Sequence, residues 1–267
     1  MKENNMVMLG QGGASYYNDL FNVNGQLTEY IITEKTYRGG IKLNDKTVVL
    51  NSNSLIQNGE DKLIFYNIKT KKIINEIEGY SFTISTNNLL LMPREEIKNN
   101  NKILLCACKK YNKDKKNGIL LVNPNLGDNK RIENEFYETY NFEVYCFCQI
   151  FIFENNNKNL KNLPIDKKGI KKTNTDYFFV GGFDLEKREG KIKLFKIIYG
   201  KKTWNTKIKY IQDIEFEDNE KFEEFDGPIS CIIQSKTNGH ILATCYNGNI
   251  YLFTPPNIDY YLKNNYF

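Results

Sequence analysis

The 267-residue sequence contains one tryptophan, one histidine and six prolines, and these low numbers exclude several kinds of protein. A single imidazole, that of His240, rules out metal sites and acid–base pairs that need two histidines. No window approaches the roughly 18 apolar residues of a membrane span. Residues 1–6 lack the apolar stretch of a signal peptide, and no Asn-x-Ser/Thr sequon occurs. We therefore expect a cytoplasmic protein that makes no contact with a membrane.

The sequence also lacks a strong excess of one charge, because 37 basic residues face 32 acidic ones for a net charge of +5. A dedicated nucleic-acid-binding protein usually concentrates a larger basic excess, so we do not expect nucleic acid as a partner. The glycine clusters 10–13 and 181–182 are not followed by the helical pattern that a phosphate-binding loop requires. We interpret them as hairpin glycines, and we expect neither a cofactor nor a small-molecule substrate.

The six cysteines do not form a metal-binding pattern. Cys106 and Cys108, like Cys146 and Cys148, are two residues apart within expected strands, where such side chains share a face about 6.6 Å apart along the chain. Two thiolates on one zinc ion lie closer, under about 4 Å. We expect reduced cysteines that act as small buried hydrophobes, and no metal site.

What the chain does contain is a recurring strand unit, rich in the 17 Phe and 18 Tyr that favour pleated sheets. A glycine-bearing turn, with Gly59, Gly118, Gly190 or Gly248, precedes a short apolar run each time. The runs are Leu63–Tyr66, Ile119–Val122, Ile192–Phe195 and Ile250–Phe253. Each run ends a hairpin, so one supersecondary unit is predicted to repeat through an all-β chain.

Longer modules surround these hairpins, with a further strand before each and usually a fourth strand after it. They span residues 38–78, 80–138, 142–217 and 227–267, and a partial module spans 6–36. We expect one domain, 1–267, built as an array of about five four-stranded antiparallel modules. The partial module 6–36 lacks its first strand, and the fourth strand of module 227–267 is doubtful. Either about five modules, as the blades of a propeller, close imperfectly, or the chain is part of a larger propeller.

Strand order and spacing resemble the WD-repeat-like β-propeller family, whose four-stranded sheets pack radially around a channel. The likeness does not extend to the motifs. The Trp-Asp dipeptide is missing, and Gly239-His240 lies between the first and second strands of its module rather than at the blade entrance. What the resemblance implies is a fold and a non-catalytic role as a scaffold that binds other proteins.

One segment is a candidate partner surface, because acidic residues alternate there with aromatic ones. Its residues are Phe216, Glu217, Glu220, Phe222, Glu223 and Phe225, and such a composition could dock a basic partner through its aromatic rings. No residue is assigned a catalytic role. Two alternatives stay open: a propeller-based hydrolase or oxidoreductase with a site at the channel mouth, and a fragment of a larger propeller protein with no function of its own. The partner, the pathway and the blade count are not fixed by the sequence.

Overall fold

The structure is a computed structural model in which every regular element is a β-strand over the residues it describes. It describes residues 6–9, 16–21, 27–33, 36–44, 46–53, 61–67, 69–70, 72–83, 85, 87–92, 102–110, 115–124, 132–150, 175–199, 206–214, 225, 227–235 and 240–253. Within these ranges, no helix has the length and apolar character needed to cross a membrane. The expectation of an all-β chain is confirmed.

The strands of the first half form two sheets and begin a third. The first sheet contains β1 (Met6–Leu9), β2 (Tyr16–Phe21) and β3 (Leu27–Thr33), and the second contains β4 (Thr36–Lys42), β5 (Thr47–Asn53), β6 (Lys62–Asn67) and β7 (Lys72–Ile77). The third sheet contains β8 (Tyr80–Phe82), β9 (Leu89–Met92), β10 (Ile103–Lys110), β11 (Asn117–Val122) and β12 (Asn134–Tyr140).

The second half adds two further sheets. The fourth sheet contains β13 (Phe142–Gln149), β14 (Thr175–Asp184), β15 (Glu189–Ile198) and β16 (Lys207–Asp213). The fifth contains β17 (Ile229–Gln234), β18 (Ile241–Cys245) and β19 (Ile250–Phe253). Every pairing among these strands is antiparallel, and all except that of β8 with β10 join strands that are consecutive in the chain, as repeated hairpins require. The four apolar runs predicted from the sequence form β6, β11, β15 and β19.

The third sheet differs from the expected four-stranded module because its first position is occupied by two short strands. Both β8 and β9 pair with β10, through Phe82 opposite Cys108 and Leu91 opposite Leu104. The sequence prediction recognised the first of these and missed the second. The stretch Leu89–Met92 is apolar like the predicted runs, but it does not follow a glycine-bearing turn, which was the signal from which the repeated hairpins were predicted.

Several glycines predicted at turns lie inside strands instead. Gly118 is in β11 and Gly190 is in β15, while Gly181 and Gly182 are in β14. A Cβ atom on Gly118 would lie 2.3 Å from the carbonyl oxygen of Tyr137, and one on Gly190 would lie 2.1 Å from that of Gly227. These two glycines are therefore explained by close approach of a neighbouring backbone rather than by a turn.

Successive sheets bury their apolar faces against one another. One core cluster joins the second and third sheets, with Phe65 and Leu104 both fully buried. A second joins the third and fourth around Phe178 and Leu105, and a third joins the fourth and fifth around Phe179 and Ile232. Because each middle sheet packs on both sides, its strands are apolar on both faces.

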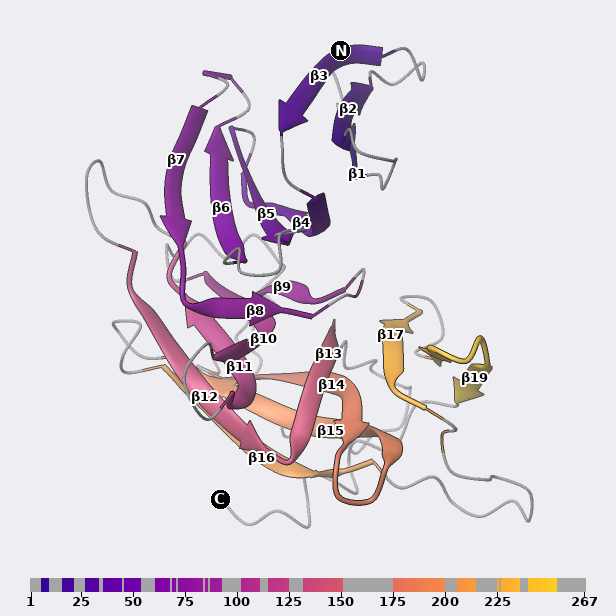
Figure 1. The fold of residues 1–267 in the computed structure, drawn as a ribbon. Helices are drawn as coiled ribbons and strands as arrows, with labels where there is room; N and C mark the ends of the chain where they lie inside the picture. Colours follow the sequence, from indigo (N-terminus) through magenta and orange to yellow (C-terminus); the bar gives the residue numbers. More distant parts are fainter. Residues whose placement is uncertain are drawn as a thin grey trace, which may run out of the picture.

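The first strands of successive sheets lie close together, and the array curves around them. The loop between β8 and β9 reaches the fifth sheet, where the Ser85 hydroxyl donates to the carbonyl of Ser230 at 2.5 Å. The Asn87 side-chain amide donates to Cys231 Sγ at 3.2 Å. The sheets follow one another in chain order along an open path, with β1–β3 and β17–β19 at its two ends (Figure 1).

Candidate interaction surface

The outer face of the fifth sheet is apolar and exposed. Ile233 on β17 lies opposite Leu242 on β18, and Leu242 lies opposite Leu252 on β19, so the three side chains form one row on one face. Ile250 shares this face two residues before Leu252. The side chains of Ile233, Ile250 and Leu252 are 51 %, 68 % and 69 % exposed. We call these four residues the β17–β19 patch.

The opposite face of the same sheet is buried against the fourth sheet. Ile232, Ile241 and Ala243 alternate with the patch residues and are at most 4 % exposed. A three-stranded sheet with both faces apolar has the sequence pattern of a sheet covered on both sides. In the part of the chain that the structure describes, the inner face is covered while Ile233, Ile250 and Leu252 stay exposed, which leaves the patch available for a further contact.

A pocket of 330 Å³ opens beside the patch. Its lining consists of Ile233, Leu242 and Leu252 from the patch and of the polar residues Gln234, Ser235 and His240. The backbone amide of Ser235 donates to the carbonyl of His240 at 2.8 Å, which closes the β17–β18 end of the pocket. The single histidine thus lies directly before β18, between the first and second strands of its sheet as expected, and it lines a mostly apolar recess.

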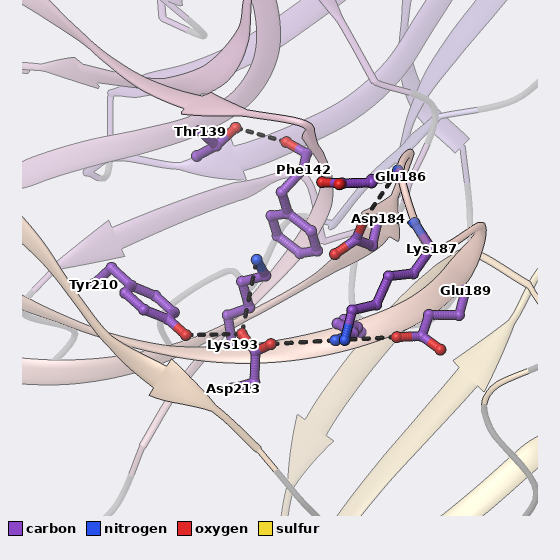
Figure 2. Close-up of polar contacts among 10 residues, drawn as sticks. Thr139, Phe142, Asp184, Glu186, Lys187, Glu189, Lys193, Tyr210 and Asp213 are labelled. Carbon is purple, nitrogen blue, oxygen red and sulfur yellow. Dashed lines mark hydrogen bonds and ion pairs between the residues drawn. The ribbon is translucent and has the colours of Figure 1, made fainter.

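A cluster of charged side chains lies on the fourth sheet (Figure 2). Lys191 pairs with Glu189 at 3.0 Å and with Asp213 at 3.3 Å. Lys193 Nζ lies 4.4 Å from the centroid of the Phe142 ring and 3.7 Å from Asp213 Oδ1. The Tyr210 hydroxyl donates to the same Asp213 oxygen at 3.0 Å.

The protonation of this cluster follows from its pairing. Burial lowers the pKa of Lys191, but its contacts with Glu189 and Asp213 outweigh burial and raise that pKa overall. Burial and the bond to Asp213 raise the pKa of Tyr210 to about 12. The lysine is therefore held charged and the phenol held neutral. The ion pair between Lys191 and Asp213 joins β15 to β16.

A second polar group lies where β13 approaches β10 and the β18–β19 turn. Glu143 forms an ion pair with Lys109, and the Tyr145 ring packs edge-on against Tyr246 with centroids 5.3 Å apart. Burial and the nearby Glu143 carboxylate raise the pKa of Tyr145. Tyr246 is 48 % exposed, so this aromatic pair reaches the surface at one end of the sheets.

The six cysteine side chains are thiols rather than disulfides, and five of the six are buried. Burial raises the pKa of the Cys106 and Cys108 thiols, which keeps both protonated and unreactive. Cys146 Sγ packs among Ile229 and Ile232 at Gly181, as expected of a small hydrophobe. Among the described residues, no three or more His, Cys, Asp or Glu side chains gather closely enough to hold a metal ion.

The candidate surface predicted from the sequence is mostly outside the described residues. Phe225 is described and is buried at 5 % exposure, with its ring 4.8 Å from that of Tyr251 and 5.9 Å from that of Phe253. Its side chain therefore packs within the chain. Phe216, Glu217, Glu220, Phe222 and Glu223 lie outside the described ranges, and their role stays a prediction. Sequence reasoning missed the β17–β19 patch, although the absence of charge from β17, β18 and β19 was visible.

These observations define an all-β protein built of antiparallel sheets packed in chain order, with an apolar surface at one end. No protein-family model matches the chain, and no curated protein matches its sequence.

Proposed function

We propose that the chain is a non-catalytic protein-interaction scaffold with a β-propeller-like arrangement of the WD-repeat-like kind. Support for the arrangement comes from the packing of the second, third, fourth and fifth sheets on one another and from the gathering of first strands. The bonds from Ser85 to Ser230 and from Asn87 to Cys231 connect the third sheet to the fifth across that gathering. A rigid array of this kind is suited to presenting surfaces to other proteins.

The observation that carries the binding role is the β17–β19 patch. Isolated apolar side chains are common on protein surfaces, but a contiguous group on a sheet face usually marks a contact site. Ile233, Leu242 and Leu252 are contiguous across three strands, and Ile250 extends the group along β19.

The polar groups favour a scaffold over the enzyme alternative. Each described cluster consists of charges that neutralise one another, as in the pairs of Lys191 with Glu189 and Lys109 with Glu143. The side chains that join the first strands, Ser85 and Asn87, are neutral. We also propose a cytoplasmic location, which is supported by cysteine side chains that are thiols and mostly buried, as in proteins of a reducing compartment.

Affinity capture from the native cell tests the proposal with two matched double variants. Ile250→Glu with Leu252→Glu places two charges on the patch. Ile73→Glu with Ile74→Glu makes the same change at exposed positions, 52 % and 44 %, on β7 of the second sheet. We expect the patch variant to lose specific proteins that the wild type and the β7 variant retain. If all three capture the same set, the patch is not a binding site.

A second arm of the same experiment addresses the acidic segment. Glu217, Glu220 and Glu223 are changed together to lysine, which reverses the charge expected to attract a basic partner. Loss of partners that the patch variant still captures would show a separate surface. An unchanged set would remove the support for the acidic segment as a partner surface.

A further inference from the structure

The turn between β12 and β13 carries an exposed tyrosine in a backbone conformation that suits glycine. Tyr140, the last residue of β12, has a φ of 55°, in the left-handed region that bulky side chains rarely adopt. Its side chain is 76 % exposed, so the ring contributes little to the core. Glycine would remove the strain and lose little buried surface. The fold therefore gives no reason for an aromatic residue at this position.

Contacts on both sides hold this turn in place. Towards the third sheet, Asn117 Nδ2 donates to the carbonyl of Tyr140 at 3.3 Å, and the register shifts between Asn117 and Gly118. Towards the fourth sheet, the Leu185 amide donates to the carbonyl of Asn141 at 2.8 Å. Register shifts and strained residues are both frequent at functional sites, where they direct a side chain. The ring of Tyr140 is thus presented on a fixed backbone.

Two further turns carry cations close to Tyr140. Lys110 and Lys115 lie at the turn between β10 and β11, and Lys187 and Arg188 lie at the turn between β14 and β15. All four residues are exposed. Within the described ranges none of the four belongs to an ion pair, unlike the lysines of the neighbouring strand positions. Their charges are therefore available to a partner.

Strand pairing places both of these turns beside the β12–β13 turn. Asn117, the first residue of β11, lies opposite Tyr140, so the β10–β11 turn ends next to it. Asp184, the last residue of β14, lies opposite Phe142, and the Arg188 amide donates to the carbonyl of Asp184 at 2.8 Å. Figure 2 shows this second turn close to Phe142. One end of the third and fourth sheets therefore brings the exposed ring and the two basic turns together.

The carboxylates around these turns leave a positive surface. Glu143 forms an ion pair with Lys109. Glu138 forms one with Lys116 at 2.9 Å. Glu186 is exposed and accepts a hydrogen bond from the neighbouring turn, so it is one negative charge beside four positive ones. Such an excess attracts an acidic partner and repels a basic one.

We propose that this surface binds an acidic peptide segment of another protein. We call it the Tyr140 surface, and it consists of Lys110, Lys115, Tyr140, Lys187 and Arg188. Carboxylates of the segment pair with the cations, and Arg188 can hold one of them in bidentate geometry. An apolar side chain of the segment packs on the Tyr140 ring, as aromatic anchors do in interfaces. The surface is separate from the β17–β19 patch, so it does not rest on the role proposed for that patch.

Fluorescence anisotropy of the purified full chain with labelled synthetic peptides tests the proposal. The probe peptide repeats Glu-Glu-Leu, and the control peptide of equal length repeats Gln-Gln-Leu. We expect the acidic peptide to bind with a dissociation constant on the order of 100 µM at low salt, and at least about tenfold more tightly than the control. Added salt should weaken the binding, because it screens exposed charges.

Two matched double variants locate the binding. Lys110→Glu with Arg188→Glu reverses one charge on each basic turn and should weaken binding of the acidic peptide by about tenfold or more. Lys207→Glu with Lys209→Glu makes the same change of net charge at exposed lysines of β16. This control should bind the peptide like the wild type, unless the attraction comes from net charge alone.

Tyr140→Gly separates a binding role of the ring from a structural one. We expect the affinity for the acidic peptide to fall by about tenfold, because the aromatic anchor is lost. The urea midpoint of unfolding should stay equal or rise, because glycine adopts this φ without strain. Tyr140→Phe retains the ring and should bind like the wild type. A lower midpoint with unchanged affinity would mean that the ring serves the fold.

The proposal is overturned if the acidic peptide binds no more tightly than the glutamine peptide, or if the β16 control loses as much affinity as the turn variant. A single-stranded DNA oligonucleotide of equal negative charge is a third probe. Tighter binding of the DNA through the same residues would make this a nucleic-acid site and contradict the proposal. Ile250→Glu with Leu252→Glu should bind the peptide like the wild type, so failure here leaves the patch and the proposed function standing.

Discussion

At the scale of single residues, Gly181 marks a close approach of the fourth sheet to the fifth. A Cβ atom at this position would lie 2.7 Å from both Cys146 Sγ and Ile229 Cγ2, and 2.8 Å from Ile232 Cδ1. All three neighbours are buried, so none can move into open space. The sheet interface therefore requires glycine at this point because of packing rather than backbone flexibility.

We predict that Gly181→Ala lowers the free energy of unfolding by about 1–3 kcal/mol, because the methyl group overpacks the interface. Urea denaturation followed by circular dichroism measures the change. Gly227→Ala is the matched control, since a Cβ atom there would meet nothing within 4 Å. Equal midpoints for the two variants would show that the two sheets are not packed this closely.

Asp184 gives a residue-scale prediction about pH. Burial raises its pKa, but the backbone amides of Lys187 and Glu186 both donate to Oδ1 at 3.0 Å and, with Lys193 and Lys191 nearby, lower the pKa overall. The unfolded chain has the ordinary aspartate pKa of about 3.9. The stabilisation from this carboxylate is therefore present above about pH 4 and is lost as pH falls through the lower folded value.

Asp184→Asn retains an oxygen for the two amides and removes the charge. We expect it to be less stable than the wild type near neutral pH, with the difference shrinking toward zero below about pH 4. Urea denaturation at a series of pH values measures this. Glu135→Gln, an exposed change on β12, controls for the loss of one carboxylate. A difference that is the same at every pH would contradict the assigned cause.

At the scale of elements, the recurring short apolar runs predicted most strands. This signal is local, because it depends only on residues that are neighbours in the sequence. Leu63, Phe65 and their counterparts on β11 and β15 alternate as a pleated strand requires, and they are buried. The predictions that failed depended on contacts between residues that are far apart in the sequence. Nothing near Gly118 indicates that the carbonyl of Tyr137 lies against it.

The functional surface was hard to predict for a related reason. Phe225 lies in an acidic aromatic stretch typical of a docking segment, yet its ring is buried against Tyr251 and Phe253. Ile250 and Leu252 read as core residues from their alternation, yet they are exposed. Whether an apolar residue is core or surface depends on which sheet follows its own, and local sequence does not contain that information.

The β8–β9 loop provides an element-scale prediction. Its Ser85 and Asn87 side chains donate to the fifth sheet at Ser230, Cys231 and Ile232. Replacing Ser85 and Asn87 together by alanine removes these bonds, each contributing about 1 kcal/mol. We expect faster hydrogen exchange in peptides covering β17 and β18, with β11 unchanged.

Asn67→Ala is the control for this loop. The Asn67 side chain forms hydrogen bonds too, but it accepts them from the backbone amides of Lys69 and Thr70, and they lie within an exposed turn of the second sheet. It should leave exchange in β17 unchanged. Unaltered exchange in the double variant as well would mean that the loop does not hold the fifth sheet in solution.

At the scale of the whole molecule, the packing is a series in which each sheet stabilises its neighbours. Such an array approximates a one-dimensional chain of coupled units, and its end units have fewer neighbours. The third and fourth sheets pack on both faces, through two clusters each. The fifth sheet packs on one face, and its outer face carries Ile250 and Leu252 exposed. Stability should therefore decrease toward this end.

We predict that β17–β19 exchanges amide hydrogens faster than β10–β11 or β14–β15 in dilute protein, because opening the fifth sheet breaks only one sheet interface. Hydrogen-exchange mass spectrometry on peptides from each sheet measures the order. A ring closed within the chain would cover both faces of every sheet and make protection nearly equal, so equal rates would contradict the open series.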